Sequence, residues 1–206
     1  MSSKIEFYQK FLEEKIVAVV RGKDAKEAAA IAEAAVKGGL NAIELTYTTP
    51  GVEDVFKHFA GTNALIGAGT VLDEETARHA ILNGAQFVVS PHFDPKIAKT
   101  CNRYSIPYFP GCMTIKEMVQ AMEYGSDILK LFPANGFDPS FIGSVNGPLP
   151  NVRVMPTGGI NLNNMNEWLD AGAVAVGIGS DLTKAYRSAG EDAVVKLVQE
   201  YLTKLG

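Results

Sequence analysis

The stretch IVAVVRGKDAKEAAAIAEAAVKGGLNAIELT, residues 16–46, contains one strand–helix–strand unit. Its two ends, 16–21 and 41–46, are short and rich in β-branched residues, which is typical of strands. Between them, the alanine-rich segment 24–39 has helical spacing, opens on a capping aspartate and closes at Gly38. Two strands joined by a helix are expected to run parallel.

The same unit recurs along the rest of the chain. Helical segments at 73–85 and 114–125 separate some of the later strands, and Gly84, Gly125 and Gly172 mark helix ends. Further strands are predicted at 64–70, 86–90, 107–110, 127–132, 152–157 and 173–178.

Eight strands that alternate with helices predict an α/β protein, a (β/α)8 TIM barrel formed by one domain over residues 1–206. The amphipathic segment before the first strand is predicted to be an additional N-terminal helix that caps the bottom of the barrel. A doubly wound open sheet is the alternative fold. Against it, no GxGxxG motif follows the first strand, and GAGTVLD at 67–73 has the wrong spacing for that motif.

The composition narrows the class of protein. The chain has 206 residues, of which 47% are hydrophobic and 20% charged, enough to fill one sizeable core. Its apolar runs are far shorter than the roughly 20 residues that cross a bilayer, and its N-terminal segment lacks the apolar region of a secretory signal, so we expect a cytoplasmic protein without a membrane partner. A net charge of −4 with scattered basic residues argues against nucleic acid as a partner. Cys101 and Cys112 lack CxxC spacing and are expected to be free thiols.

Polar residues stand where several of the apolar strands end. In barrels of this kind, the carboxyl ends of the strands form the rim that carries the active site. The candidates at this rim are Arg21, Glu44, Thr70, Ser90, Lys130, Thr157 and Ser180.

Alternation along two strands turns a lysine and a glutamate to the same side. In DILKLF, Lys130 shares a face with Ile128 and Phe132, and in NAIELT, Glu44 shares a face with Ala42. Both charged side chains are therefore predicted to point into the barrel.

A lysine inside an apolar strand has two interpretations. Lys130 and Glu44 form either a buried ion pair, which is costly to desolvate and adds little stability, or a reactive pair. Because burial disfavours an ammonium group, a lysine in this place is expected to offer a free amine that attacks a carbonyl, with the glutamate moving protons. The sequence favours the second interpretation, a Schiff-base lysine.

Two glycine-containing stretches follow the last two strands. PTGGINLNN at 156–164 and GIGSDL at 177–182 each end a strand and lead into a helix. Backbone N–H groups at such turns, with helix N-termini behind them, form the phosphate site common in barrels at strands seven and eight. We therefore predict that a phosphate or carboxylate of the substrate binds at Thr157, Gly158, Gly159, Gly179 and Ser180.

These motifs together resemble a known family. NAIELTYTTP, IGAGTVLD, FVVSPHFD, YFPGCMT, DILKLFPA, PTGGINLNN and AVGIGS occur in this order over nearly the whole chain. They are similar to the bacterial KDPG/KHG aldolases, class I enzymes that cleave 2-keto-3-deoxy-6-phosphogluconate (KDPG) or 4-hydroxy-2-oxoglutarate (KHG).

The resemblance implies a role for individual residues. It implies that Lys130 is the Schiff-base lysine, that Glu44 is the general acid/base and that Thr70 holds the keto-acid carboxylate. It further implies that Phe132 and Pro91 line the pyruvyl pocket. The phosphate would meet Gly158, Gly159 and Ser180. The resemblance also implies a homotrimer that acts on a small keto acid without a cofactor.

The chain departs from this family at one position. Many members have an arginine four residues after the catalytic glutamate, where this sequence has Thr48. Arg21, which ends the first strand, is the predicted source of that positive charge. No metal site is predicted, because His58, His79 and His92 show neither HxH nor HExxH spacing.

Three substrates and two other functions stay open at this point. KDPG, its galactonate epimer and KHG all yield pyruvate, and the sequence does not select among them. A sugar-phosphate isomerase barrel also pairs a glutamate base with a lysine near a phosphate site, without a covalent intermediate. A barrel retained as a binding or regulatory protein would bind ligand without turnover.

Overall fold

The computed structural model describes residues 4–206 of the chain. The strands are β1 (Ile16–Val20), β2 (Ala42–Thr46), β3 (Leu65–Gly69), β4 (Val88–Val89), β5 (Tyr108–Phe109), β6 (Gly111–Cys112), β7 (Leu129–Leu131), β8 (Val154–Pro156) and β9 (Val176–Ile178). The helices are α1 (Lys4–Glu13), α2 (Ala25–Gly38), α3 (Glu74–Leu82), α4 (Pro95–Arg103), α5 (Ile115–Glu123), α6 (Ser140–Asn146), α7 (Met165–Asp170), α8 (Ser180–Ala189) and α9 (Glu191–Leu205), with short 3-10 helices η1 (Val52–Phe59) and η2 (Ala134–Gly136).

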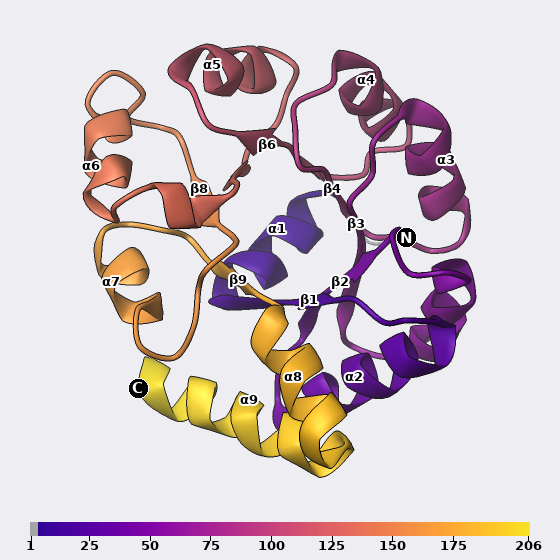
Figure 1. Ribbon diagram of the computed structural model, residues 1–206. Coiled ribbons are helices and arrows are strands. Elements are labelled where there is room, and N and C mark those ends of the chain that lie inside the picture. Colours follow the sequence, from indigo (N-terminus) through magenta and orange to yellow (C-terminus); the bar gives the residue numbers. More distant parts are fainter. Residues whose placement is uncertain (1–3) are drawn as a thin grey trace.

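The strands form two parallel sheets. The larger sheet has the order β5-β4-β3-β2-β1-β9, and the smaller has the order β6-β7-β8. An isolated parallel bridge joins Thr157, after β8, to Gly177 in β9. Helices surround the strands in a ring (Figure 1). The predicted α/β class with parallel strands is thus confirmed, and the strands form a curled sheet.

The predicted strand 107–110 is divided in the structure. Pro110 separates β5, which pairs with β4, from β6, which pairs with β7. Proline has no N–H group to donate to a neighbouring strand, so pairing stops there. Its carbonyl oxygen still accepts a hydrogen bond from the Lys130 N–H group, at 2.9 Å.

Other predicted strands are shorter than expected, and for the last two of them the backbone shows why. The Val152 N–H group closes a turn by donating to the carbonyl oxygen of Leu149, so the strand predicted at 152–157 begins only at Val154. Likewise, the Ala173 N–H group donates to the carbonyl oxygen of Trp168 and continues the end of α7. The strand predicted at 173–178 therefore begins only at Val176.

Local capping explains where α2 begins and ends. The Asp24 side chain accepts a hydrogen bond from the backbone N–H group of Glu27, at 2.8 Å. At the other end, Gly38 is still helical, and Gly39 is the residue that takes the left-handed conformation, with φ of 115°. The predicted stop at Gly38 is thus displaced by one residue.

Side chains of alternating strand residues lie in two separate cores. Ala42 and Ile128, which share faces with the glutamate and the lysine, lie in the smaller core, while Ile43 and Leu129 belong to the larger core that includes the surrounding helices. The predicted facing of these two strands is therefore confirmed.

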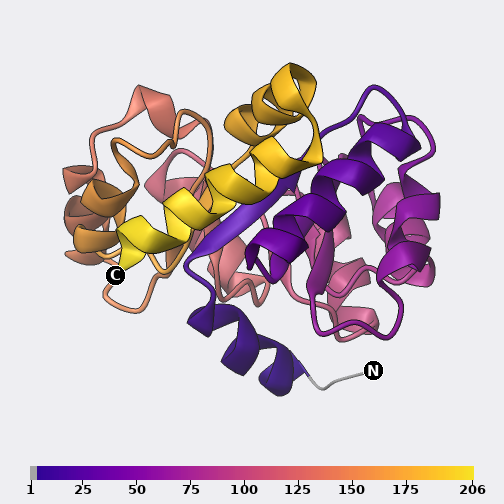
Figure 2. The ribbon, with the colours of Figure 1, turned by 90° about the horizontal axis from the view of Figure 1, so that it is seen from below.

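The N-terminal helix closes the smaller core from below. Phe7 and Phe11 of α1 are buried, and the ring of Phe11 lies 4.9 Å from that of Phe109 between their centroids. Figure 2 shows α1 crossing the bottom of the molecule, away from the other helices. The predicted capping helix is confirmed for residues 4–13, and the first three residues lie outside the described part.

The structure also bears on membrane insertion. Over residues 4–206, no helix combines the length and the apolar character needed to cross a membrane.

Candidate active site

Lys130 and Glu44, which belong to different sheets, meet between them. Lys130 is the middle residue of β7, and its side chain is 6% exposed. Glu44 is the middle residue of β2 and is completely buried. The Lys130 Nζ atom lies 3.4 Å from Oε1 of Glu44, although 86 residues separate the two in sequence. The structure therefore brings together the two charged groups that the alternation pattern turned inward.

Glycines on the neighbouring strand make room for this pair. Gly69 of β3 lies against the Glu44 carboxylate, and a Cβ atom at this position would overlap it. Two residues earlier, a Cβ atom at Gly67 would overlap the ring of Phe87. The motif IGAGT thus provides the space in which a carboxylate and an aromatic ring fit inside the sheet.

The contact between the pair is loose for a buried salt bridge. Charge-assisted N–H···O bonds typically measure about 2.7–2.9 Å, which is shorter than the 3.4 Å observed. The Oε2 atom of Glu44 is buried and has no hydrogen-bond partner within residues 4–206. The Lys130 Nζ atom also lies 5.0 Å from the centroid of the Phe132 ring. An unpartnered buried carboxylate oxygen next to an amine suits proton transfer better than it suits stability.

A cavity of about 470 Å³ is lined by Phe132, whose ring lies next to the Lys130 amine, whereas Lys130 and Glu44 themselves are not part of its lining. It contains most of the predicted substrate-binding residues. The cavity is lined by Val19, Arg21, Phe132, Thr157, Gly158, Gly159, Ile160, Gly177, Gly179, Ser180, Thr183, Lys184 and Arg187.

Several groups in this cavity are placed to hold an anion. Gly158 and Gly159 adopt left-handed backbone conformations, with φ of 94° and 82°. Ser180 is the first residue of the ten-residue helix α8, whose N-terminal N–H groups have no partner within the helix. The Oγ1 atom of Thr157 is buried and unpartnered within residues 4–206.

Two predicted site residues lie outside the cavity lining but beside the pair. Thr70 follows Gly69 directly and has a φ of 57°, a strained conformation for a threonine. Pro91 packs its backbone against Gly111, the β6 residue that pairs with Lys130. Both residues therefore lie at the lysine end of the site.

The loop that carries Pro91 is held by a hydrogen-bond network. The hydroxyl groups of Ser90 and Tyr108 lie 2.6 Å apart, and both donate to the carbonyl oxygen of His92. Burial raises the pKa of the Tyr108 hydroxyl, which therefore stays protonated as a donor. Ser90, a rim candidate, thus supports this loop.

Arg21 lies where the sequence predicted a replacement for the arginine absent at position 48. It directly follows β1, and the next N–H group, that of Gly22, donates to Oγ1 of Thr49 at 3.0 Å. This bond ties the strand end that carries Arg21 to the loop that carries Thr48. Within residues 4–206, no acidic side chain lies within ion-pair distance of the Arg21 guanidinium group.

Three cavity residues on α8 were not predicted from the sequence: Thr183, Lys184 and Arg187. The first of these donates from its hydroxyl group to the carbonyl oxygen of Arg21, at 3.3 Å. The sequence did contain a signal for two of them. Thr183 and Lys184 follow Ser180 by three and four positions, and residues at this spacing lie on the same helix face.

Arg187 does not offer a free charge to the cavity. Its Nε and Nη2 atoms donate to the two carboxylate oxygens of Glu27, at 2.9 and 3.1 Å. Glu27 also accepts from the backbone N–H group of Lys23. These hydrogen bonds, with that of Arg187 foremost, lower the pKa of Glu27 from 4.5 to about 2. The ion pair therefore fastens α8 to the first turn of α2.

We expect Glu27→Gln to lower the melting temperature by about 2–4 °C at pH 7, since one partner of the pair is more than half exposed. Because the pKa of Glu27 lies below its ordinary value, its contribution to stability is complete above about pH 5 and is lost as the pH falls towards 2. Thermal denaturation of both proteins between pH 7 and pH 3 checks this. The difference between them should narrow in acid, and a difference that stays constant would contradict the assignment.

Comparison with known proteins agrees with this geometry. The family model for KDPG and KHG aldolases matches residues 8–197. The chain belongs to this aldolase family. The family predicted from the sequence is therefore confirmed, and with it the class of enzyme, a carbon–carbon lyase.

Relatives of this aldolase differ in their named substrates. The 2-dehydro-3-deoxy-6-phosphogalactonate aldolase of Escherichia coli (strain K12) is 34% identical over 182 residues, which cover 86% of this chain and 89% of the relative. The KHG/KDPG aldolase of the same strain is 34% identical over 191 residues, which cover 90% of this chain and 89% of the relative.

A solved structure carries a covalent intermediate. The KDPG aldolase of Legionella pneumophila, with pyruvate captured at low pH as a covalent carbinolamine, matches this aldolase with a TM-score of 0.81. The two are 28% identical, and the match covers 92% of this chain and 94% of that one.

Proposed function

We propose that this aldolase cleaves KDPG to pyruvate and glyceraldehyde 3-phosphate, KHG to pyruvate and glyoxylate, or both. Cleavage of 2-keto-3-deoxy-6-phosphogalactonate is the alternative. Relatives named for the phosphogalactonate and for KHG/KDPG are equally identical to this chain, so overall identity does not choose among the substrates. A sugar-phosphate isomerase is disfavoured by the family to which the chain belongs.

One observation carries the proposal. The buried Nζ atom of Lys130 lies 3.4 Å from a carboxylate whose second oxygen has no partner within residues 4–206. This arrangement supports covalent catalysis by an amine with an adjacent acid/base. Such chemistry requires both groups, whereas an isomerase would use the lysine only as a charge.

The reaction begins with the formation of a Schiff base. The Lys130 amine adds to the C2 ketone of the substrate, and loss of water from the carbinolamine leaves an iminium ion. Glu44 takes the proton of the C4 hydroxyl group as the C3–C4 bond breaks, and the electron pair of that bond moves to C3 and forms an enamine. The aldehyde leaves, the enamine is protonated at C3, and water hydrolyses the imine to release pyruvate and the free amine.

The far end of a phosphorylated substrate fits the anion-holding groups of the cavity. The turn at Gly158 and Gly159 and the N-terminus of α8 at Ser180 offer backbone N–H groups on two sides of this space. Gly179 precedes the helix, and Thr157 adds an unpartnered buried hydroxyl. These groups support a phosphate subsite. Thr70 and Pro91, at the lysine end, suit the carboxylate and methylene of the pyruvyl part.

We also propose that the strands form a closed eight-stranded barrel. The small inner core has residues in or next to strands of both sheets, including Val17, Phe109, Ile128 and Met155. The bridge between Thr157 and Gly177 links the two sheets at one junction. At the other junction, a single proline separates β5 from β6. These observations support (β/α)8 closure.

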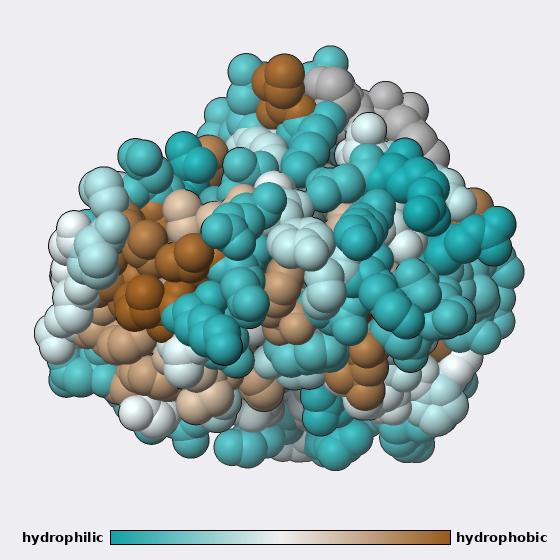
Figure 3. Space-filling model, turned by 90° about the horizontal axis from the view of Figure 1, so that it is seen from above, coloured by the Kyte–Doolittle hydropathy of each residue, from teal (hydrophilic) through white to brown (hydrophobic). Residues whose placement is uncertain are grey.

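A homotrimer, which the resemblance implies, fits an apolar region of the surface. Met113 and Ile115, at the start of α5, are 46% and 40% exposed. Figure 3 shows hydrophobic residues gathered on the side of the molecule that carries α5 and α6. A second copy of the chain that covered this region would remove apolar side chains from water.

Steady-state kinetics tests the proposed function. Pyruvate release is measured by a coupled assay with KDPG, with its galactonate epimer and with KHG, and kcat/KM is compared among the three. Pyruvate formed from at least one of the two substrates in the main proposal supports it. Turnover of the galactonate epimer alone selects the alternative, and the absence of pyruvate from all three contradicts an aldolase of this class.

Arg21→Ala is expected to lower kcat/KM by about 10–150-fold, the range given by loss of a charge-assisted hydrogen bond to a carboxylate or phosphate. Arg21 is exposed, lines the cavity and has no acidic partner within residues 4–206, so folding should be nearly unaffected. The assay compares KDPG with KHG. An equal loss on both assigns Arg21 to the carboxylate, and a loss confined to KDPG assigns it to the phosphate. A lower melting temperature with unchanged kinetics would make Arg21 a structural residue.

A further inference from the structure

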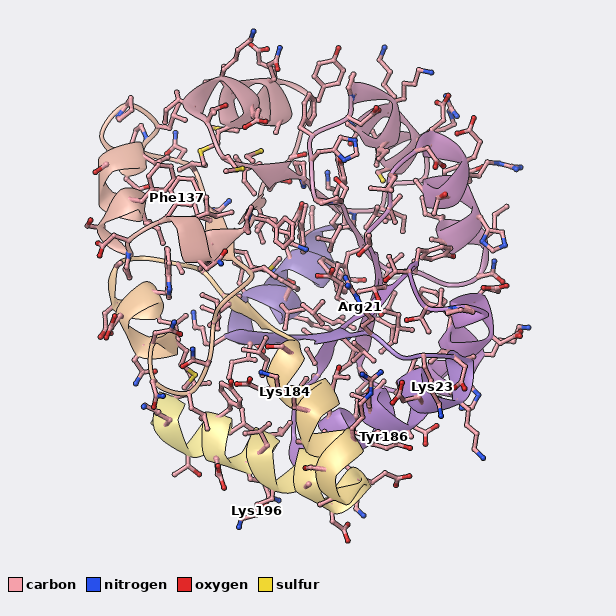
Figure 4. All side chains as sticks on the ribbon, in the orientation of Figure 1. Arg21, Lys23, Phe137, Lys184, Tyr186 and Lys196 are labelled. Carbon is pink, nitrogen blue, oxygen red and sulfur yellow. The ribbon has the colours of Figure 1, made fainter. Side chains whose placement is uncertain are left out.

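Lys184 brings a second unpaired positive charge to the cavity. It lies in the second turn of α8, four residues after Ser180, and both residues line the same space. Side chains four positions apart lie on one face of a helix, so the ammonium group extends along the face that begins at the anion-holding N-terminus. Figure 4 shows Arg21 near the centre of the ring and Lys184 on α8 at its edge.

The charges of the cavity are unbalanced. Its lining has three basic side chains, Arg21, Lys184 and Arg187, and no aspartate or glutamate. Only Arg187 forms an ion pair within residues 4–206, with Glu27. Two positive charges thus face the cavity without a partner, and such a site favours a ligand with more than one negative charge.

Arg21 and Lys184 differ in their position in the cavity. Arg21 ends β1, whereas Lys184 belongs to the helix whose first residue, Ser180, lies beside the turn at Gly158. The substrates differ at the end that would reach this helix. KDPG has a phosphate on C6, two carbons beyond the C4 hydroxyl, and a phosphate monoester carries about −1.5 to −2 charges at neutral pH. KHG instead ends in a carboxylate attached directly to C4.

We propose that Lys184 is a specificity-determining residue that pairs with the terminal phosphate of the substrate and favours phosphorylated over unphosphorylated keto acids. The inference deepens the proposed function and rests on it. The backbone N–H groups at Gly158, Gly159 and Ser180 fix the position of the phosphate, and the ammonium group supplies the charge. A shorter substrate, held at the Schiff-base lysine, does not extend to Lys184.

The test compares Lys184→Gln with the unchanged enzyme on KDPG and KHG. We expect the KM for KDPG to rise on the order of tenfold with kcat nearly unchanged, the lower part of the range for a charge-assisted hydrogen bond, because the side chain is exposed. Both constants for KHG should change less than about twofold. The effect should shrink at high salt, since exposed charges are screened.

Two variants serve as controls. Lys196→Gln removes the same charge from α9, where the side chain is exposed and points outward from the edge of the molecule (Figure 4). It should leave the kinetics on both substrates unchanged. Lys184→Arg keeps the positive charge and should restore most of the affinity for KDPG.

Binding of inorganic phosphate supplies a readout without turnover. Isothermal titration should give a dissociation constant for Lys184→Gln that is several-fold higher than that of the unchanged enzyme. Equal losses on KDPG and KHG, or no change in either KM, would overturn the inference and leave the aldolase assignment intact. If none of the substrates yielded pyruvate, the proposed function would be overturned instead. In that case, phosphate titration by itself would decide the role of Lys184. Equal affinities of Lys184→Gln and the unchanged enzyme for phosphate would exclude that role.

Discussion

Replacement of Lys130 by alanine is expected to reduce kcat/KM by roughly 10⁴-fold or more, since removal of the nucleophile from a covalent enzyme costs up to about 10⁶-fold. Its Nζ atom is the amine that lies beside the buried Glu44 carboxylate. The retro-aldol assay with KDPG measures this loss. A variant that kept near-native turnover would rule out a Schiff base at this position.

The covalent intermediate itself can be captured. Incubation with pyruvate followed by borohydride reduces the imine to a stable secondary amine, which peptide mass spectrometry locates. The adduct should map to Lys130, be absent from Lys130→Ala and persist in Lys196→Gln. Labelling that survives the loss of Lys130, or an active enzyme that is never labelled, would contradict the assignment.

A second variant guards against misfolding. Lys130→Ala leaves the fully buried Glu44 carboxylate without its hydrogen-bond donor and opens a space in the sheet, and both effects destabilise a fold. Lys130→Met has an unbranched side chain of about the length of the lysine stem, so it lacks the amine but leaves far less empty space than alanine. Circular dichroism of both variants separates loss of chemistry from loss of structure, because a folded and inactive Lys130→Met protein leaves the amine as the cause.

Period-2 alternation was sufficient to predict that Lys130 and Glu44 point towards each other. Ala42 and Ile128 both lie in the inner core, so the side chains that share their faces, Glu44 and Lys130, point the same way. This inference needed only the sequence, because a strand fixes the direction of each side chain once one residue is assigned. The glycines that admit the carboxylate, Gly69 above all, are equally visible in the motif IGAGT.

The positions of the cations around the cavity were harder to predict. Arg187 and Lys184 are three residues apart on α8, yet one is held by Glu27 and the other has no partner within residues 4–206. Which of them pairs depends on how α8 packs against α2, a contact between segments about 160 residues apart. Sequence spacing places both on one helix but does not specify that packing. The division of a strand at Pro110 likewise depends on which neighbours it pairs with.

The second large effect is expected at Glu44. Glu44→Gln keeps the shape of the side chain, and its amide oxygen still accepts a hydrogen bond from Lys130. The amide cannot take a proton from the C4 hydroxyl group. We expect kcat to fall by about 10²–10⁴-fold, the usual contribution of a general acid/base, while pyruvate still binds.

Two measurements separate proton transfer from a change of structure. Single-turnover cleavage of KDPG reports the loss at the bond-breaking step, and borohydride trapping with pyruvate reports whether Lys130 still forms an imine. A slow variant that is trapped assigns the proton transfer to Glu44, whose free Oε2 atom faces no competing donor within residues 4–206. Glu44→Asp retains a carboxylate on a shorter side chain and should recover part of the rate. If Glu44→Gln turned over at a near-native rate, a water molecule or another residue would have to be the base, and the unpartnered oxygen would need a different explanation.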